Sequence, residues 1–285
     1  MRKHAFTVSI ILVFLIGLSV LLYPTVSSYI NSLRQSRVVA GYYAGLSRLS
    51  ERDFTDLLNA AHEYNRKLPG NQNRFVLSDN EMAEYMSLLN PNGNGVMGVL
   101  EIGSIDVRLP IYHGTSEGVL QIGAGHIEGT SLPVGETGTH SSVTGHRGLP
   151  SSLLLTNLDK LAKGDTFVLR ILNQTLTYKV DQILVVDPEE MDPLAIDMDM
   201  DYCTVVTCTP YGINSHRMLV RGYRVANAAE DEAVVIFEEL AEDGGYSLIL
   251  LFSAAAFITL IFSIALYKLN KRVLRRVRIH GKGTD

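Results

Sequence analysis

The sequence is poor in cysteine, in charge and in repeated segments. Only two cysteines, Cys203 and Cys208, occur among 285 residues, and charged side chains make up 19%. If both lie on one strand they are about 16 Å apart at ~3.3 Å per residue, which is too far for a disulfide bond. Hydrophobic residues make up 46%, and we find no internal repeat or low-complexity tract. This composition argues against a disordered, collagen-like or coiled-coil chain.

Two long runs, 5–23 and 244–267, contain no charged residue at all. At about 1.5 Å per residue, each run can cross a hydrocarbon core of about 30 Å as a helix. Arg2 and Lys3 precede the first run, and seven basic residues follow the second. By the positive-inside rule, both termini are therefore expected in the cytoplasm and the middle of the chain outside it.

The first run could also belong to a cleaved signal peptide, because small residues follow it at 26–28. Its 19 residues exceed the roughly 7 to 15 of a signal core, which favours an uncleaved anchor. The segments expected along the chain are a cytoplasmic start (1–4), a transmembrane helix (5–23), an extracellular helical segment with a candidate lid region (24–94), a β-barrel domain (95–227), a linker (228–243), a transmembrane helix (244–267) and a basic cytoplasmic tail (268–285).

The exported part of the chain is acidic. It carries 16 basic and 29 acidic residues, and its basic residues form no cluster. Such a surface repels the phosphate backbone of nucleic acids. We therefore expect no nucleic-acid partner.

Helical signals dominate from 24 to about 89. Ser50 can cap a helix whose apolar residues recur on one face and that ends near Gly70. Ser78 and Glu81 have the spacing of a capping box, which predicts a second short helix. The run of Asn, Pro and Gly at 90–95 then breaks the chain, so we expect a domain boundary there.

Short runs rich in Val, Ile, Thr and Leu follow the boundary, separated by Gly, Pro, Asn and Asp. One helical turn is expected near 157–163. The predicted strands are 96–102, 105–111, 118–123, 140–146, 166–172, 175–186, 202–208 and 217–226. Eight short strands with little helix predict a mainly β fold, an eight-stranded barrel that hides its sheet edges.

The densest group of chemically capable residues lies in TVVTCTPYGINSHRMLVRG, residues 204–222. Cys208 ends an apolar, β-branched run and is followed by a turn sequence, so its thiol is expected at an exposed strand end. If the next run is the neighbouring antiparallel strand, Arg217 stands beside Cys208. A guanidinium there can activate a thiol and donate hydrogen bonds to a developing oxyanion.

A base must come from elsewhere in the chain, and the candidates are the five histidines of the predicted barrel domain. His146 is favoured because it ends a predicted strand, close to Gly145 and Gly148, where substrate can approach closely. A cysteine and a distant histidine are a weak signal by themselves. The other candidates are His113, His126, His140 and His216.

These residues carry a family resemblance. TCTPYGINSHRMLVRG resembles the cysteine and arginine signature of class C, pilin-polymerising sortases. GAGHIEGTSLPVG and GTHSSVTGHRGLPSS resemble the block with the family histidine, and the likeness covers roughly residues 96–226. The resemblance implies Cys208 as nucleophile, His146 as general acid and Arg217 as the oxyanion-stabilising residue of a sortase-type β-barrel.

The implied activity is transpeptidation on the outer side of the membrane of a Gram-positive bacterium. The cysteine would cleave a Leu-Pro-x-Thr-Gly sorting signal between Thr and Gly, and a pilin lysine would resolve the thioester. No metal or organic cofactor is implied. Pilin subunits and the membrane are the expected partners. Residues expected to line the substrate groove are Thr207, Thr209, Tyr211 and Arg147.

Three alternatives stay open: a housekeeping sortase that anchors surface proteins to the cell wall, a hydrolytic cysteine peptidase, and a non-catalytic wall-binding module. The second apolar run favours the pilin enzyme over the housekeeping one. Many class C sortases carry a lid with an Asp-Pro-aromatic motif, which residues 71–89 lack. The capping box at Ser78 indicates an ordinary helix start there and argues against a lid of that type.

Other polar residues are expected to be structural. Cys203 should point away from the Cys208 face and be buried, since five positions separate the two. His126 and His140 lie in glycine-bounded turns and should make structural hydrogen bonds. Residues 187–201 hold seven carboxylates but depart from a calcium-binding loop, so we expect a solvated acidic loop.

Overall fold

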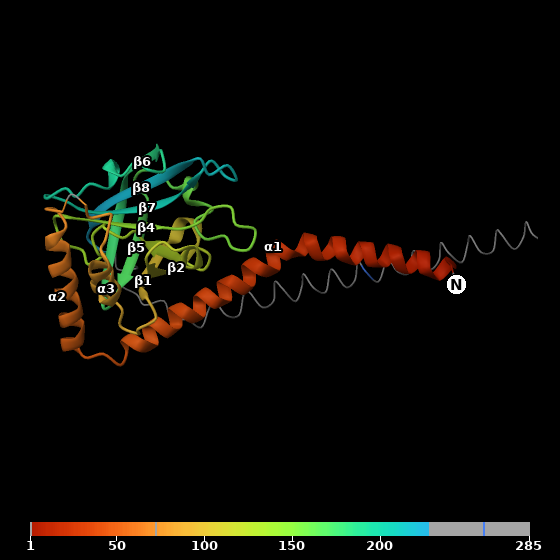
Figure 1. The fold of residues 1–285 in the computed structure, drawn as a ribbon, viewed down its shortest axis with the longest axis horizontal. Coiled ribbons are helices and arrows are strands. Elements are labelled where there is room, and N and C mark those ends of the chain that lie inside the picture. Colours follow the sequence, from red (N-terminus) through yellow and green to blue (C-terminus); the bar gives the residue numbers. More distant parts are fainter. Residues whose placement is uncertain (1, 72, 228–258, 260–285) are drawn as a thin grey trace, which may run out of the picture. The chain divides into compact units, whose positions relative to one another are not determined.

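The computed structural model describes residues 2–71, 73–227 and 259, and eight strands form its closed barrel (Figure 1). The strands are β1 (Val96–Ile102), β2 (Val107–His113), β3 (Ala124–His126), β4 (Thr139–Thr144), β5 (Thr166–Ile171), β6 (Gln174–Val186), β7 (Asp201–Thr209) and β8 (His216–Val225). Their order around the barrel is β1-β2-β3-β4-β7-β8-β6-β5. The predicted eight-stranded barrel is confirmed.

Pairing in the barrel is mixed. The pairs β2–β3 and β4–β7 are parallel, and the other neighbouring strands are antiparallel. The β1–β5 pair closes the sheet on itself, so no edge is left among the eight strands. Strand β7 consequently has β4 on one side and β8 on the other.

One predicted strand is wrong. Residues 118–123 begin within a helical turn, α4 (Glu117–Leu120), and the strand β3 starts only at Ala124. The backbone N–H of Gln121 donates to the Glu117 carbonyl at 3.1 Å, which closes that turn. Strand β3 can approach its neighbour closely because Gly125 has no side chain, and a Cβ there would lie 2.3 Å from the Gly114 carbonyl oxygen.

Helical elements precede the barrel and interrupt its connections. The longer helices are α1 (Arg2–Leu46), α2 (Glu51–Lys67) and α3 (Asp79–Ser87). Short 3-10 turns are η1 (Gly103–Ile105), η2 (Leu158–Lys160) and η3 (Asp192–Leu194). The turn predicted near 157–163 is therefore confirmed.

Helix α1 contains the first predicted membrane span and continues beyond it to Leu46, with Pro24 inside. Within the described residues one helix, Ser9–Leu46, is long and apolar enough to cross a membrane, with a mean hydropathy of 2.3. The second predicted span, 244–267, lies outside the described residues apart from Thr259.

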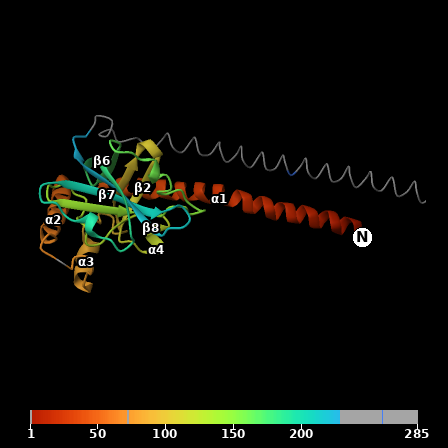
Figure 2. The same cartoon turned by 90° about the horizontal axis from the view of Figure 1, so that it is seen from above.

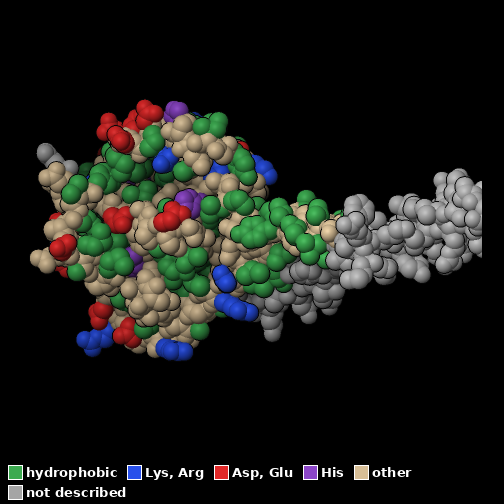
Figure 3. All heavy atoms as spheres, turned by 45° about the vertical axis from the view of Figure 1, so that its right-hand side comes forward, with side chains coloured by type: hydrophobic (Ala, Val, Ile, Leu, Met, Phe, Trp, Pro, Cys, Tyr) green, Lys and Arg blue, Asp and Glu red, His purple; other side chains and the backbone are tan. Residues whose placement is uncertain are grey.

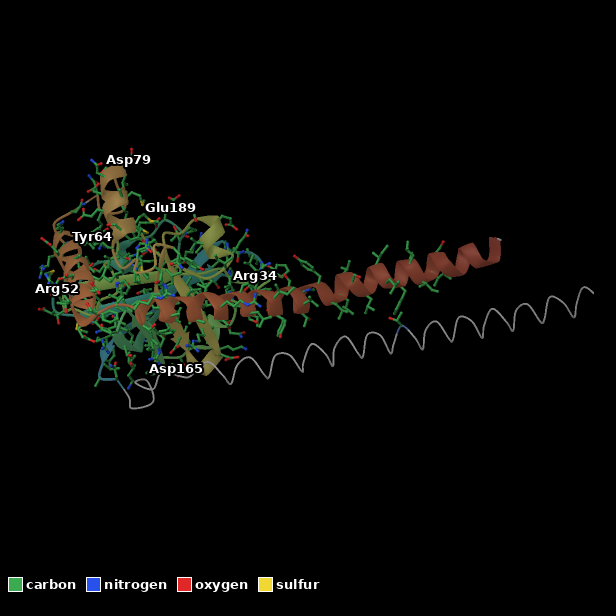
Figure 4. The ribbon with its side chains drawn as sticks, turned by 90° about the horizontal axis from the view of Figure 1, so that it is seen from below. Arg34, Arg52, Tyr64, Asp79, Asp165 and Glu189 are labelled. Atoms are coloured by element: carbon green, nitrogen blue, oxygen red, sulfur yellow. The ribbon has the colours of Figure 1, made fainter. Side chains whose placement is uncertain are left out.

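Both predicted helix starts are confirmed. The Ser50 hydroxyl accepts from the Asp53 backbone N–H, and Ser78 and Glu81 form the reciprocal pair of a capping box. Helices α2 and α3 lie on the same side of the barrel (Figures 1 and 2), and the rings of Tyr64 and Tyr85 are 6.4 Å apart. Arg52 lies on the outer side of α2 (Figure 4).

Buried hydrogen bonds attach the helical segment to the barrel. The Asn65 side chain donates to the Leu132 carbonyl at 2.9 Å and accepts from the Leu132 N–H at 2.7 Å. The Tyr42 hydroxyl donates to the Met97 carbonyl at 2.9 Å and accepts from the Leu172 N–H at 2.8 Å. These bonds satisfy backbone groups that the helices would otherwise leave buried and unpaired.

The Tyr42→Phe substitution should lower the free energy of unfolding by about 1–3 kcal/mol, because it leaves a buried N–H and a buried carbonyl without a partner. Urea denaturation of the detergent-solubilised chain measures the change. Tyr211→Phe is the matched control, since that ring is 60% exposed. Equal stability of the two variants would contradict the role given to the Tyr42 hydroxyl.

Two histidines are held neutral inside the fold. The His140 ring bonds through Nδ1 to the Ala195 carbonyl at 2.8 Å and through Nε2 to the Thr204 hydroxyl at 2.7 Å. The Nε2 atom of His126 lies 2.9 Å from the Ser131 carbonyl oxygen. Burial lowers the pKa of each ring from 6.5 to about 4. Their predicted structural hydrogen bonding is confirmed.

Stability should therefore fall as the pH drops from about 6.5 to about 4, because the unfolded chain takes up protons that the folded rings exclude. Each ring contributes up to about 1.4 kcal/mol per pH unit. Asp201 acts in the opposite sense, since burial raises its pKa to about 6 and its contribution is lost as the pH rises. Asp201 thus offsets one of the two histidines. Between pH 4 and 6 the free energy of unfolding should fall with decreasing pH by the contribution of a single histidine.

Denaturation at several pH values tests this balance. His140→Gln should flatten the stability profile across the window, whereas the substitution of an exposed histidine, His216→Gln, should leave its slope unchanged. A slope that is the same in His140→Gln as in the parent chain would contradict the account.

Candidate active site

Cys208 lies at the next-to-last position of β7 and is half-buried, with a free thiol. Along β7, Val205 and Thr207 point to the opposite face from Val206 and Cys208, because side chains alternate on a strand. Val206 lines a groove on the barrel surface, so Cys208 is on the groove side of the strand. The thiol expected at an exposed strand end is thus at the end of the groove floor.

Arg217 is the register partner of Cys208 on β8, which confirms the predicted neighbourhood of the two. Its Nη1 donates to the carbonyls of Asn214 at 3.3 Å and His216 at 3.1 Å. Among the described residues no carboxylate forms an ion pair with Arg217. Its guanidinium lines the groove, where the described part of the chain provides no counter-ion for it.

His146 lies two residues beyond the end of β4, the strand that pairs with β7 on the side opposite β8. The parallel register pairs Thr144 with Val206, and the Gly145 N–H donates to the Val206 carbonyl at 3.2 Å. Continuing this register by two residues brings His146 opposite Cys208. The arginine is thus the observed register partner of the cysteine, and the neighbourhood of His146 and Cys208 stays a prediction.

Glu117 is a site neighbour that the sequence analysis missed. Its Oε1 lies 3.3 Å from His146 Nε2, and a hydrogen bond from Gln121, followed by the contact with His146, lowers the pKa of the Glu117 carboxyl. The strand predicted over 118–123 gave no reason to expect a helical turn that begins at Glu117. A serine followed by a glutamate before an apolar turn was the available signal for a helix start.

The groove beside these residues is a cavity of about 280 Å³. Leu194, Val206 and Leu219 form its apolar floor, and Arg217 stands at its end. In the space-filling view, histidine and acidic side chains lie side by side on the domain surface among apolar ones (Figure 3). The complete lining is Thr115, Leu120, Ile127, Thr144, Val186, Pro188, Glu190, Met191, Leu194, Val206, Arg217 and Leu219.

One wall of the groove is the acidic connection between β6 and β7. Two contacts fix it: His140 of β4 bonds to the Ala195 carbonyl, and Arg74 Nη2, from the segment before α3, donates to the Leu194 carbonyl at 2.9 Å. Burial of the Arg74 guanidinium lowers its pKa. Glu189 of this connection is exposed (Figure 4). The segment preceding α3 therefore braces a groove wall, and its role as a lid stays a prediction.

The expected groove-lining residues differ in exposure. Tyr211 is 60% exposed in the β7–β8 turn, whereas Thr207 and Thr209 are buried. The side chain of Arg147 is 8% exposed, with its Nη2 on the carboxylate of Asp159. Of these four, Tyr211 alone has a largely exposed side chain.

The second cysteine and two remaining histidines lie outside the constellation. Cys203 is fully buried, as predicted, and burial raises the pKa of its thiol well above the usual value, which disfavours a thiolate. His113 bonds to the carbonyls of Gly95 and Leu88. His216 is exposed, 3.6 Å from an Asp187 oxygen.

Comparisons with known proteins agree with this geometry. A sortase domain model matches residues 100–225. The structure of sortase C1 from Streptococcus agalactiae is similar, with 46% identity, a TM-score of 0.65, and coverage of 67% of this chain and 100% of that one. Sortase C from Streptococcus pneumoniae has 40% identity and a TM-score of 0.59, with coverage of 68% and 98%.

A more distant relative is sortase D of Bacillus subtilis (strain 168), which is 26% identical over 148 residues, or 51% of this chain and 72% of that protein. The barrel, the free thiol at the end of a groove and the extent of the likeness to solved sortases agree with one another. The chain belongs to the sortase family, as a cysteine transpeptidase of the sortase C type.

Proposed function

We propose that Cys208, His146 and Arg217 form the catalytic set that cleaves a Leu-Pro-x-Thr-Gly sorting signal. The Cys208 thiolate attacks the threonine carbonyl carbon, and the carbonyl oxygen becomes an oxyanion beside the Arg217 guanidinium. As the tetrahedral intermediate collapses, the C–N bond breaks and the His146 imidazolium gives its proton to the departing glycine amine. A thioester on Cys208 remains.

The second half of the reaction transfers the acyl group to an amine. A lysine amine attacks the thioester carbonyl, the C–S bond breaks, and the thiolate leaves. The neutral His146 ring takes the proton lost by the attacking nitrogen, which returns the site to its starting state. The product is an isopeptide bond between two polypeptides.

The observation that carries this proposal is the strand register. Cys208 and Arg217 are direct partners across β7 and β8, and the β4–β7 register, which ends at Thr144 and Val206, would pair His146 with Cys208 if it were extended by two residues. In the proposed arrangement all three meet beside an apolar groove that Arg217 lines and whose volume is about 280 Å³. Such a groove suits the Leu and Pro side chains of a sorting signal, and Tyr211 is a further wall residue in this proposal.

Pilin subunits are the proposed substrates and acceptors. The similar sortase C from Streptococcus pneumoniae was described with regard to its pilin substrate specificity. Attachment to a cell-wall precursor, as in a housekeeping sortase, would use the same acylation and differ only in the amine that resolves the thioester. The acceptor therefore distinguishes the two.

We also infer that the enzyme is anchored twice in the membrane, with both termini in the cytoplasm. Residues 5–23 and 244–267 are the proposed spans, and 95–227 form the extracellular catalytic domain. The apolar helix Ser9–Leu46 supports the first span. The segment 24–94, the linker 228–243 and the basic tail 268–285 complete the proposed organisation.

Incubating the full chain with a Leu-Pro-x-Thr-Gly peptide should give an acyl adduct in intact-mass spectrometry. The adduct should persist in Cys203→Ala, whose thiol is buried, and disappear in Cys208→Ala. An adduct that survives in Cys208→Ala would contradict the assignment of the nucleophile. Absence of any adduct with the parent chain would contradict the transpeptidase mechanism.

Addition of a lysine-bearing pilin to the adduct should release the thiol and form an isopeptide. If the thioester adduct instead reacts selectively with the amine of a cell-wall precursor, the activity is that of a housekeeping sortase.

Arg217→Lys should reduce the acylation rate constant by about 10²- to 10³-fold, because an oxyanion loses its fixed donor. Peptide binding should change little, since the ground-state carbonyl carries no full charge. The matched control is Arg221→Lys, four positions along β8 and paired with Asp181. Time courses of acylation, quenched at successive times, give the rate constants. Equal rate constants for both variants would rule out oxyanion stabilisation by Arg217.

A further inference from the structure

The residues on either side of Cys208 face away from the groove. Thr207 is 1% exposed, and Thr209 is also buried. By the alternation of a strand, both point to the face opposite the thiol. They are consequently poorly placed to touch a peptide lying in the groove.

Thr207 instead holds the residue that precedes His146. Its Oγ1 donates to the Gly145 carbonyl oxygen at 2.8 Å. This bond continues the β4–β7 pairing past the last strand residue of β4, Thr144. It therefore fixes the chain one residue before the histidine to the chain one residue before the cysteine.

Arg147 makes the corresponding connection on the other side. Its side chain is 8% exposed, and Nη1 lies 3.4 Å from the Thr209 hydroxyl. The same guanidinium donates through Nε to the Thr156 carbonyl at 3.2 Å and through Nη2 to Asp159. The residue after His146 is thus tied both to the residue after Cys208 and to the β4–β5 connection.

The next residue tightens this contact. Gly148 has a φ of +79°, and a Cβ there would lie 3.1 Å from the Tyr211 ring. The absence of a side chain lets the ring lie directly over the backbone. The guanidinium of Arg147 is 5.9 Å from the centre of the same ring. The β4–β5 and β7–β8 connections are therefore in contact.

We propose that Thr207 and Arg147 are positioning residues that set the approach of His146 to Cys208. The inference rests on the proposed catalytic set and replaces the groove-lining role expected for Thr207, Thr209 and Arg147. Proton transfer requires the ring to lie within hydrogen-bond reach of the leaving amine while the thiolate attacks. The Thr207 hydrogen bond before the histidine and the Arg147 hydrogen bonds after it restrict both the position and the tilt of the ring.

Thr207→Val tests the hydrogen bond from Thr207 to the Gly145 carbonyl, because valine keeps the shape of threonine and loses the hydroxyl. Under single-turnover conditions with a Leu-Pro-x-Thr-Gly peptide, the acylation rate constant should fall about 10- to 100-fold at unchanged half-saturating peptide concentration. Thr207→Ser, which keeps the donor, should restore the parent rate. A partly unfolded variant would lose adduct amplitude, whereas a mispositioned histidine lowers the rate constant.

Thr139→Val is the matched control. That threonine is also buried, lies on β4 and donates its hydroxyl to a backbone carbonyl, that of Glu136. It should keep the parent rate constant. Arg147→Lys keeps the charge but not the fork of donors and should reproduce the loss seen in Thr207→Val.

Measurement of the parent chain alongside the variants distinguishes a failure of the positioning role from a failure of the catalytic set. If the parent chain is acylated and both Thr207→Val and Arg147→Lys keep its rate constant, the positioning role alone is overturned. Absence of acylation in the parent chain would overturn the catalytic set and the positioning role together.

Discussion

The backbone pairing of β7 with β4 on one side and β8 on the other is the constraint on which the site depends. The register pairs Cys208 with Arg217, nine positions away in the sequence, and sets β4, which ends two residues before His146, against the same strand. The strands range from 3 to 13 residues, and closure of the barrel fixes the register of each through the neighbours on both sides. A slip of one residue in β7 would turn Cys208 away from the groove and Thr207 toward it.

Burial assigns different roles to similar side chains in this framework. Cys203 and Cys208 occupy the same strand, but the first is enclosed and the second meets the groove. Likewise His126 and His140 are neutral parts of the interior, whereas His146 is only half-buried next to Glu117. The groove wall depends on His140 and Arg74, so residues remote from the thiol contribute to the shape of the site.

Much of this architecture could be predicted from the sequence. Alternating β-branched runs marked seven of the strands, and Ser50 and Ser78 marked two helix starts, because those signals are local. Strand β3 was missed because three residues, one of them glycine, carry too little pattern. The contact of Glu117 with His146 was missed because no local rule brings residues 29 positions apart together.

Side-chain direction was the other weak point. The expected groove residues Thr207 and Thr209 flank Cys208 in the sequence, but strand alternation gives their side chains the opposite face. Arg147 is likewise adjacent to His146 in the sequence, but its side chain bonds to Thr156 and Asp159. The apolar groove floor could not be foreseen, since Leu194 comes from a connection whose course depends on tertiary contacts.

A crystal structure of the chain with a Leu-Pro-x-threoninal peptide would test the central claim most directly. The aldehyde should form a hemithioacetal with Cys208 whose oxygen mimics the oxyanion. The account predicts that oxygen within about 3 Å of an Arg217 nitrogen, with the His146 ring on the opposite side of the adduct. An adduct on Cys208 whose oxygen points to solvent, with Arg217 turned away, would contradict the account.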